Sequence, residues 1–203
     1  MRCWPPARSA TCRCAPTRIA SRHARILAVE GVNLTDEAAV TSFYARCPPL
    51  WASIHLAGGY NAALLGDTRL ADLRGQIDLN LATSFLCCRE AVRNMRAKAV
   101  GGRLVNVSAR TAAVPTGGSV AYITAKAAVS ALVRALADEL ADERILVNGI
   151  LPATIDTPAN RAAMPDADHG EWTSPADIAA LIGWLVSPAQ TVVSGALIPV
   201  GWS

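Results

Sequence analysis

From residue 26 onward, short apolar runs alternate with longer segments whose apolar residues recur at helical spacing. The apolar runs predict strands over residues 26–30, 51–55, 103–108, 145–151 and 196–200. The segments between them predict helices over residues 35–46, 68–97, 121–143 and 174–187. This alternation is typical of an α/β protein, a doubly wound parallel sheet with helices on both faces.

Several helix ends carry local signals. Thr35 is predicted to cap the first helix, and Ser174-Pro175 with Asp177 marks the start of the last one. The long helix over residues 68–97 is expected to be broken at most at Gly75. Asn80 lies inside it, where an amide is a weak helix former and is expected to hold a kink or a water molecule.

Length and composition favour one domain. The chain has 203 residues and a hydrophobic share of 52%, enough for one substantial core. Residues 1–25 differ, with six Arg, three Cys, three Pro and no acidic residue. A transit peptide, a disordered tail or a non-native reading frame would each explain that composition. We therefore expect an atypical segment over residues 1–25 and one domain over residues 26–203.

Charge and cysteine content exclude several classes of function. A net charge of +3 without a basic stripe argues against nucleic-acid binding. No apolar run reaches the ~18 residues that a membrane span needs. The six cysteines show no standard metal-ligand spacing, so we expect no metal site and free thiols in a reducing, cytoplasmic compartment.

Candidate functional residues follow the predicted strands. Ala57 and Gly58 come after one strand, Ser108 and Ala109 after the next, and residues 152–157 after the third. In an open parallel sheet, ligands collect beyond the carboxyl ends of the strands. These positions therefore predict a binding site, although each of them alone is equally typical of an ordinary turn.

Tyr122 and Lys126 start the helix that follows the second of these strands. A spacing of four residues places both side chains on one helix face. An ammonium group beside a phenol favours the phenolate, which predicts a lowered Tyr122 pKa and a proton-exchanging pair. The plain alternative is an exposed helix face, but the pair occurs together with the strand-end residues above.

These motifs resemble those of the short-chain dehydrogenase/reductase family from about residue 26 to the end. The family's Asn-Asn-Ala-Gly corresponds to His55-Leu56-Ala57-Gly58, and its helix Asn corresponds to Asn80. Its Tyr-x-x-x-Lys corresponds to Tyr122 with Lys126, and its Pro-Gly-x-x-x-Thr to Pro152 to Thr157. The resemblance implies a Rossmann-like fold and an oxidoreductase that uses NAD or NADP, with the choice open.

The resemblance also implies roles for single residues. Lys126 would hold the nicotinamide ribose, and Tyr122 would give its proton to a small-molecule substrate as hydride arrives. Asn80 would position a water molecule that links Lys126 to solvent. The cofactor would also contact Ala57, Gly58, Pro152, Ile155 and Thr157.

One departure from the family concerns the substrate. The family's catalytic Ser lies thirteen residues before the Tyr, where this chain has Ala109, and Ser108 is one position away on a strand. One branch that works without this Ser is quinonoid dihydropteridine reductase, and residues 151–173 resemble that branch. The resemblance suggests a flat quinonoid substrate, with Trp172 as a stacking face or a core anchor.

A second departure concerns the cofactor. The family opens with a strand, a Gly-rich turn that holds the pyrophosphate, and a helix, whereas the first glycine here is Gly31. Asn33 stands where an Asp usually meets the adenine. We therefore expect an N-terminally truncated domain, whose strand over residues 51–55 is an exposed edge or pairs with residues 26–30.

Two other functions stay open. A 3-oxoacyl or carbonyl reductase of the same family is one, and a non-catalytic remnant that lacks the pyrophosphate turn is the other. The family commonly forms homodimers or homotetramers through the helices that carry Asn80 and Tyr122. Small residues on the second helix would allow such packing, namely Ala125, Ala127, Ala128 and Ala131.

Overall fold

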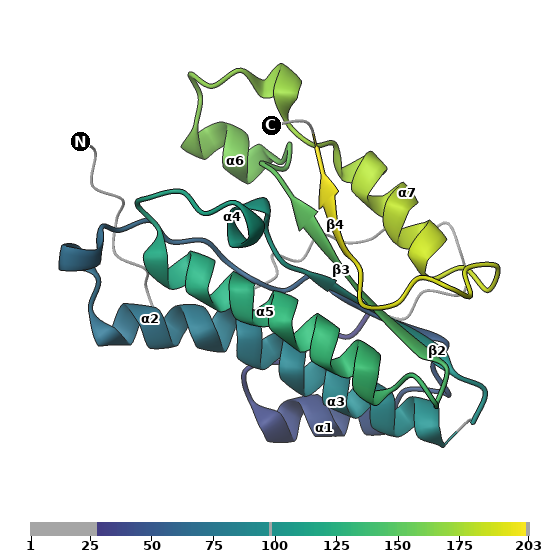
Figure 1. Ribbon diagram of the computed structural model, residues 1–203. Helices are drawn as coiled ribbons and strands as arrows, with labels where there is room; N and C mark the ends of the chain where they lie inside the picture. The colour runs from purple at the N-terminus through teal and green to yellow at the C-terminus, as the bar shows by residue number, and fades with distance from the viewer. Residues whose placement is uncertain (1–27, 98, 202–203) are drawn as a thin grey trace.

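The computed structural model describes residues 28–97 and 99–201 and confirms the predicted architecture. Four parallel strands form one sheet in the order β1-β2-β3-β4, with helices on both faces (Figure 1). The elements in chain order are α1 (Glu37–Ala45), β1 (Ala52–His55), η1 (Leu65–Asp67), α2 (Leu70–Gln76), η2 (Ile77–Ala82), α3 (Thr83–Arg96), β2 (Gly102–Val107), α4 (Arg110–Ala113), α5 (Val120–Glu139), β3 (Ile145–Pro152), α6 (Pro158–Ala163), η3 (His169–Glu171), α7 (Pro175–Leu185) and β4 (Leu197–Val200).

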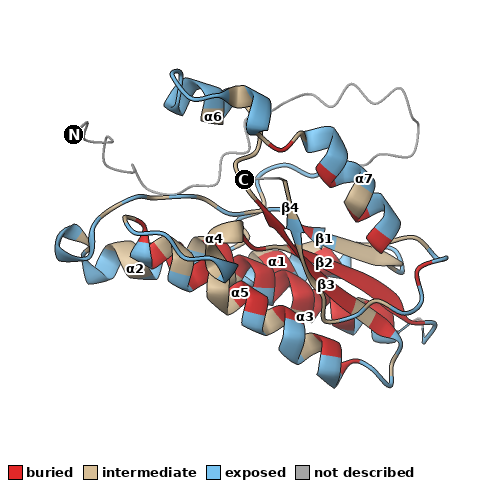
Figure 2. Ribbon diagram, turned by 45° about the horizontal axis from the view of Figure 1, so that its top comes forward, coloured by how far each residue is buried: buried red, intermediate tan, exposed pale blue. Residues whose placement is uncertain are grey.

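The central strands are β2 and β3, and they are apolar because helices cover both of their faces. Leu104 and Val105 of β2 are fully buried, as are Val147 and Ile150 of β3 (Figure 2). The strands pair in register from Gly102 opposite Ile145 onward.

The two faces of the sheet have separate cores. On one face, α1, α3 and α5 pack together, and Val40, Ala91 and Val133 belong to the same buried cluster. On the other face α7 packs through Ile178 and Ile182 (Figure 1). This arrangement fixes α5, which carries the predicted Tyr-Lys pair, against the sheet.

The start of the domain differs from the prediction. Residues 28–30 form no strand, and residues 1–27 lie outside the described part of the chain. Within residues 28–97 and 99–201, β1 therefore has β2 as its sole strand neighbour, so the predicted pairing with residues 26–30 is not found. The alternative expectation, β1 as an edge strand, holds for this part of the chain.

The structure confirms one predicted helix start and corrects one other start and one helix end. Ser174 caps α7 as expected, its hydroxyl accepting from the backbone N–H groups of Ala176 and Asp177. Asp36, and not Thr35, caps α1, because its carboxylate accepts from two N–H groups of the first turn. The helix predicted to reach residue 143 ends at Glu139 and is followed by a turn.

The long helical region has no break at Gly75. Instead α2 continues into the π-helical segment η2, which contains Asn80, and then into α3. Polar side chains satisfy the widened turn: the hydroxyl of Ser84 donates to the Asn80 carbonyl oxygen, and that of Thr83 to Leu79. Single turns of this kind often occur at functional sites.

Helix α5 has the length and composition that a membrane span needs. It is 20 residues long, and an 18-residue window within it has a mean hydropathy of 1.5. Only 28% of its apolar window is buried within the described chain. The core helix of a globular domain passes the same test, and α5 packs against the sheet through Val129 and Val133.

Candidate active site

The candidate residues lie at the carboxyl end of the sheet. Strand β1 ends at His55, β2 at Val107 and β3 at Pro152, and the loops that follow meet at this edge (Figure 1). Helix α6 lies beyond the ends of β3 and β4, and α4 lies next to the start of α5. The parallel topology therefore brings together segments that are distant in the sequence, as expected.

Lys126 is the buried cation of the site. Its ammonium Nζ donates to the carbonyl oxygen of Val107, 2.9 Å away, at the end of β2. Burial lowers the pKa of Lys126 to about 8. No carboxylate hydrogen-bonds to it among the described residues, so the ammonium retains donor capacity for a ligand.

Gly58, Asn80 and Lys126 converge on one point. A Cβ added to Gly58 would lie 2.6 Å from Asn80 Oδ1 and 3.1 Å from Lys126 Nζ. Asn80 is fully buried in η2, and its Oδ1 accepts from the Gly59 N–H at 3.1 Å. Its Nδ2 donates to the Gly59 carbonyl at 3.0 Å and to Gln76. The glycine thus leaves a small polar cradle between the β1 loop, η2 and α5.

Tyr122 has different surroundings from those expected. Its ring contacts Tyr60 edge to face, with centroids 4.9 Å apart. Burial, and secondarily the neighbouring Tyr60, raises the pKa of Tyr122 to about 12. The predicted lowering by Lys126 is not found, because the Lys126 ammonium hydrogen-bonds to the β2 carboxyl end. In this structure Tyr122 is therefore a protonated phenol at neutral pH.

Ser108 and Ala109 follow β2 and are both buried. The Ser108 hydroxyl lies 2.7 Å from the Lys126 carbonyl oxygen and 2.8 Å from Ser130 Oγ, both on α5. Its hydrogen bonds are thus made inside the core, which gives no support to its predicted contact with substrate. Ala109 starts α4 and supplies no hydroxyl in its place.

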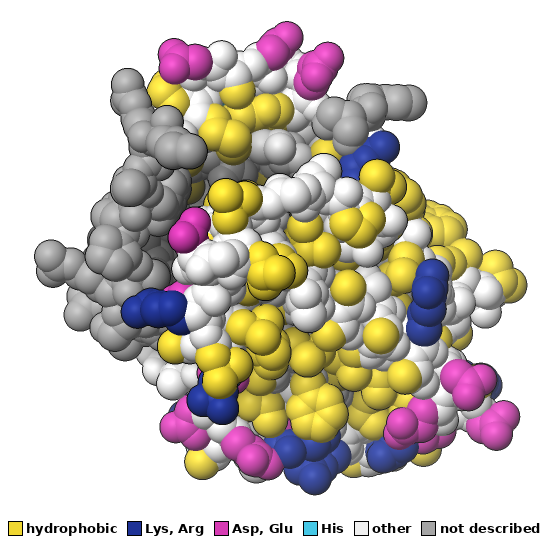
Figure 3. All heavy atoms as spheres, turned by 60° about the vertical axis from the view of Figure 1, so that its left-hand side comes forward, with side chains coloured by type: hydrophobic (Ala, Val, Ile, Leu, Met, Phe, Trp, Pro, Cys, Tyr) yellow, Lys and Arg dark blue, Asp and Glu magenta, His cyan; other side chains and the backbone are white. Residues whose placement is uncertain are grey.

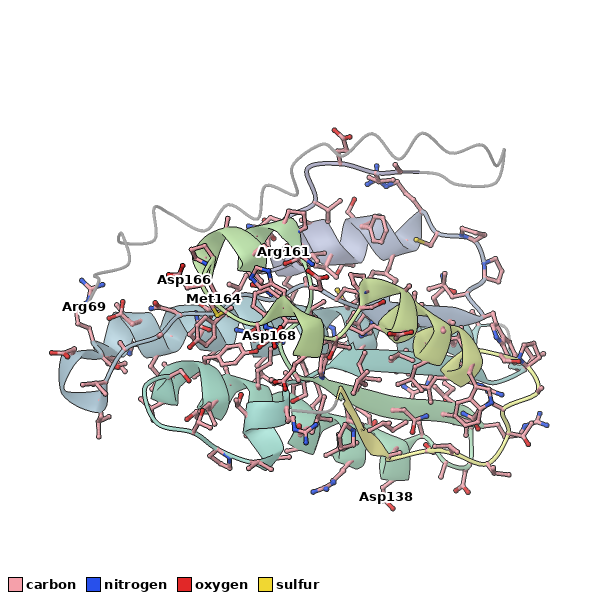
Figure 4. All side chains as sticks on the ribbon, turned by 90° about the horizontal axis from the view of Figure 1, so that it is seen from above. Arg69, Asp138, Arg161, Met164, Asp166 and Asp168 are labelled. Atoms are coloured by element: carbon pink, nitrogen blue, oxygen red, sulfur yellow. The ribbon has the colours of Figure 1, made fainter. Side chains whose placement is uncertain are left out.

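The residues after β3 form a second group. Ile155 pairs with Thr173 in an isolated bridge, and Thr157 caps α6 by accepting from the Asn160 N–H. Trp172 is half-buried and contacts the His169 ring, with centroids 4.4 Å apart. Figure 4 shows that Arg161, Met164 and Asp168 lie together on α6 and the segment after it, far from Arg69 at the start of α2.

A cavity of about 160 Å³ lies beside the end of β1. Asn33, Leu34 and Ala57 line it from the loops, and Asp78 and Leu79 line it from η2. Asn33 is where the resemblance places a contact with an adenine. Its Oδ1 accepts from the backbone N–H and the hydroxyl of Thr35.

Two features escaped the sequence analysis. Tyr60 was missed, although its position directly after Gly58-Gly59 at a strand end was a usable signal. The other feature is a buried network around His55, which hydrogen-bonds to Ser53 Oγ at 2.9 Å and to Asn106 Oδ1 at 3.0 Å. Ser53 and His55 lie two residues apart on β1, whereas Asn106 comes from β2, 51 positions after His55.

Comparison with known sequences agrees with this geometry. Residues 17–201 match the family described as enoyl-(acyl carrier protein) reductase. The chain is 29% identical over 183 residues to the uncharacterized oxidoreductase YohF of Escherichia coli (strain K12), covering 85% of this chain and 72% of that one. It is 32% identical over 148 residues to the dihydropteridine reductase of Dictyostelium discoideum, covering 70% of this chain and 62% of that protein.

A solved short-chain dehydrogenase/reductase family protein superposes on the fold with a TM-score of 0.77 and 26% identity. The match covers 83% of this chain and 73% of that one. The chain thus spans only part of the length of each relative, and less than two thirds of the dihydropteridine reductase. The matched residues and the shared fold show that the chain belongs to the short-chain dehydrogenase/reductase family.

Proposed function

We propose that this protein is an NAD(P)-dependent oxidoreductase that reduces a planar quinonoid substrate of the dihydropteridine type, with Tyr122 as proton donor. The observation that carries the proposal is the convergence of Gly58, Asn80 and Lys126 one helical turn from Tyr122. Three elements place these groups at the carboxyl end of the sheet, where open parallel sheets bind ligands.

The cradle suits the nicotinamide half of such a cofactor. The absence of a side chain at Gly58 lets Asn80 Oδ1 and the Lys126 ammonium pack against its backbone, which holds both polar groups at this point. The free donors of the Lys126 ammonium match the two hydroxyls of a ribose. Pro152, Ile155 and Thr157 would border the nicotinamide from the loop after β3. When bound, the reduced cofactor supplies the hydride.

Tyr122 would supply the proton. With a pKa of about 12, its phenol holds a proton at neutral pH. The substrate would take up a hydride and this proton, and the phenolate that forms would be reprotonated from solvent. This assignment differs from the lowered pKa expected from sequence, but it leaves the direction of proton transfer unchanged.

Ala109 favours a quinonoid substrate over an ordinary ketone. A carbonyl oxygen that becomes an alkoxide needs hydrogen-bond donors, and the usual hydroxyl is replaced here by a methyl group. A quinonoid diimine needs only hydride and one proton. The 32% identity to a dihydropteridine reductase supports the same choice. The alternative is a 3-oxoacyl or carbonyl reductase, which the 29% identity over 154 residues to the 3-oxoacyl-[acyl-carrier-protein] reductase FabG of Pseudomonas aeruginosa favours.

The first test is a fluorescence titration of the purified chain with NADH and with NADPH, followed by reduction of a quinonoid dihydropterin and of an acetoacetyl thioester. Saturable binding and faster turnover of the pterin are expected. Faster turnover of the thioester would favour the carbonyl reductase. No binding up to millimolar cofactor would overturn the proposal and favour a non-catalytic protein.

Tyr122→Phe tests the proton donor. We expect turnover to fall by about 10²–10⁴-fold, because a general acid contributes that much, while cofactor binding is retained. Tyr44→Phe is the matched control, since Tyr44 is also buried and its hydroxyl hydrogen-bonds to Ser53, away from the proposed site. Unchanged turnover in Tyr122→Phe would rule out the assigned role.

The same proposal includes a homo-oligomer and a reducing compartment. Thr124, Ala131 and Ala135 are exposed on one side of α5, and a groove of about 170 Å³ separates this helix from α2. Ala125, expected on this surface, is instead fully buried. Cys47, Cys87 and Cys88 are free thiols, in keeping with the cytoplasm.

A further inference from the structure

Tyr60 is an aromatic side chain that contacts the ring of Tyr122, the proposed proton donor. It follows Gly59 directly in the loop after β1, and 64% of its surface is exposed. Its ring meets the Tyr122 ring at an interplanar angle of 82°. In this edge-to-face geometry most of the Tyr60 surface remains open to a third ring.

The backbone next to Tyr60 is held firmly. Asn80 bonds to both the N–H and the carbonyl group of Gly59, the preceding residue. Gln76, itself buried, accepts from the same Asn80 amide through its backbone and side-chain oxygens. Two buried amides thus fix the backbone before Tyr60, and the contact with Tyr122 orients its ring.

Exposed apolar side chains lie on the loops at this edge. Leu56 and Leu64 from the loop after β1 and Val114 at the end of α4 are each more than 60% exposed, and Met164 from the loop after α6 is partly exposed. Figure 3 shows hydrophobic side chains gathered over the centre of the face on which α2 and α5 begin. A contiguous exposed apolar patch is typical of an interaction or ligand-binding surface.

We propose that Tyr60 is a specificity-determining residue that stacks on planar ring substrates as they reach the Tyr122 hydroxyl. The inference rests on the proposed function and adds to it the residue that selects the substrate class. A flat conjugated ring gains a stacking contact from Tyr60, whereas an aliphatic ketone gains none. Asn80 acts here as a positioning residue, through Gly59.

The test compares Tyr60→Ala and Tyr60→Phe with the unchanged protein on a quinonoid dihydropterin and on an acetoacetyl thioester. Because the ring and not the hydroxyl makes the contact, Tyr60→Phe should keep the pterin KM of the unchanged protein. Tyr60→Ala should raise KM for the pterin by about 3–10-fold, the value of one aromatic contact, with kcat within about twofold. KM for the thioester should not change.

A binding measurement separates this inference from the proposed function. Biopterin, a stable planar probe, is titrated by fluorescence, and its affinity should fall in Tyr60→Ala by the same 3–10-fold whether or not the chain turns over substrate. Trp184→Ala, which removes an exposed aromatic ring from α7, should change nothing. Equal biopterin affinity in Tyr60→Ala and the unchanged protein, or equal losses for both substrate classes, would overturn the inference.

Discussion

At the scale of single residues, His55 shows how a buried polar group is accommodated. Its two ring nitrogens pair with Ser53 and Asn106, and Cys88 Sγ lies 3.4 Å from Nδ1. Tyr44 extends the chain of contacts through Ser53. Burial lowers the pKa of His55 to about 4, so the ring is neutral in the folded protein at neutral pH.

His55 should make the fold sensitive to acid. Between pH 6.5 and 4 the unfolded chain binds a proton on His55 that the folded chain does not, so stability falls as the pH falls through this window. The full effect is about 3 kcal/mol. His55→Asn, which keeps a polar group in the network, should show a smaller loss of unfolding free energy between pH 7 and 4 in urea titrations. An identical loss in both proteins would contradict the assignment.

Gly58→Ala should damage the site more than the fold. The new Cβ would meet Asn80 Oδ1 at 2.6 Å and Lys126 Nζ at 3.1 Å, so one of these groups must move. We expect a loss of about 1–3 kcal/mol in unfolding free energy and at least tenfold weaker cofactor binding by fluorescence. Gly66→Ala, where no atom lies within 4 Å, is the control. Equal cofactor affinity in the two variants would mean that Gly58 and its neighbours Asn80 and Lys126 do not form part of the cofactor site.

At the scale of elements, η2 decides where the site residues point. The sequence indicated one long helix over residues 68–97. Helix propensity alone does not reveal a π-helical turn, because tertiary hydrogen bonds stabilise the extra residue of that turn. Those bonds are made by Asn80 to Gly59, which lies 21 positions earlier. The sequence identified Asn80 as unusual, but only the packing shows what it binds.

Helix α7 offers a test of how the helix propensity of a single residue affects stability. Gly183 lies in its interior and is exposed, and a methyl group added there would have no atom within 4 Å. Gly183→Ala should therefore raise the unfolding free energy by about 0.5–1 kcal/mol, because alanine loses less backbone entropy in a helix. Chemical denaturation followed by circular dichroism measures this. A decrease in stability would mean that this side of α7 is covered in the native assembly.

At the scale of the whole molecule, α5 indicates an association surface. Within the described chain, 28% of the 18-residue apolar window of α5 is buried, which leaves apolar area uncovered. Obligate subunit interfaces are apolar in the same way as a domain core. This surface would therefore pair with a second copy in the proposed homo-oligomer.

Ala131→Glu should dissociate that oligomer. Ala131 is small and exposed on α5, so a buried carboxylate at its position would disfavour contact between two copies. Light scattering coupled to size-exclusion chromatography should show a lower mass than for the unchanged protein, with the same circular dichroism. Ala180→Glu, on the exposed side of α7, should leave the mass unchanged. If both variants keep the original mass, the association surface lies elsewhere.

The sequence by itself determined the order of the four strands and of the main helices between them, the parallel sheet and the family. These follow from local periodicity and from motifs such as Tyr122 with Lys126, which need only a few neighbouring residues to be read. Tertiary structure alone decided the partner of the Lys126 ammonium, the raised pKa of Tyr122 and the contact with Tyr60. The physical reason is that burial and hydrogen bonding between distant segments set the pKa values and the ring contacts. The spacing of residues along the sequence does not show which distant segments meet.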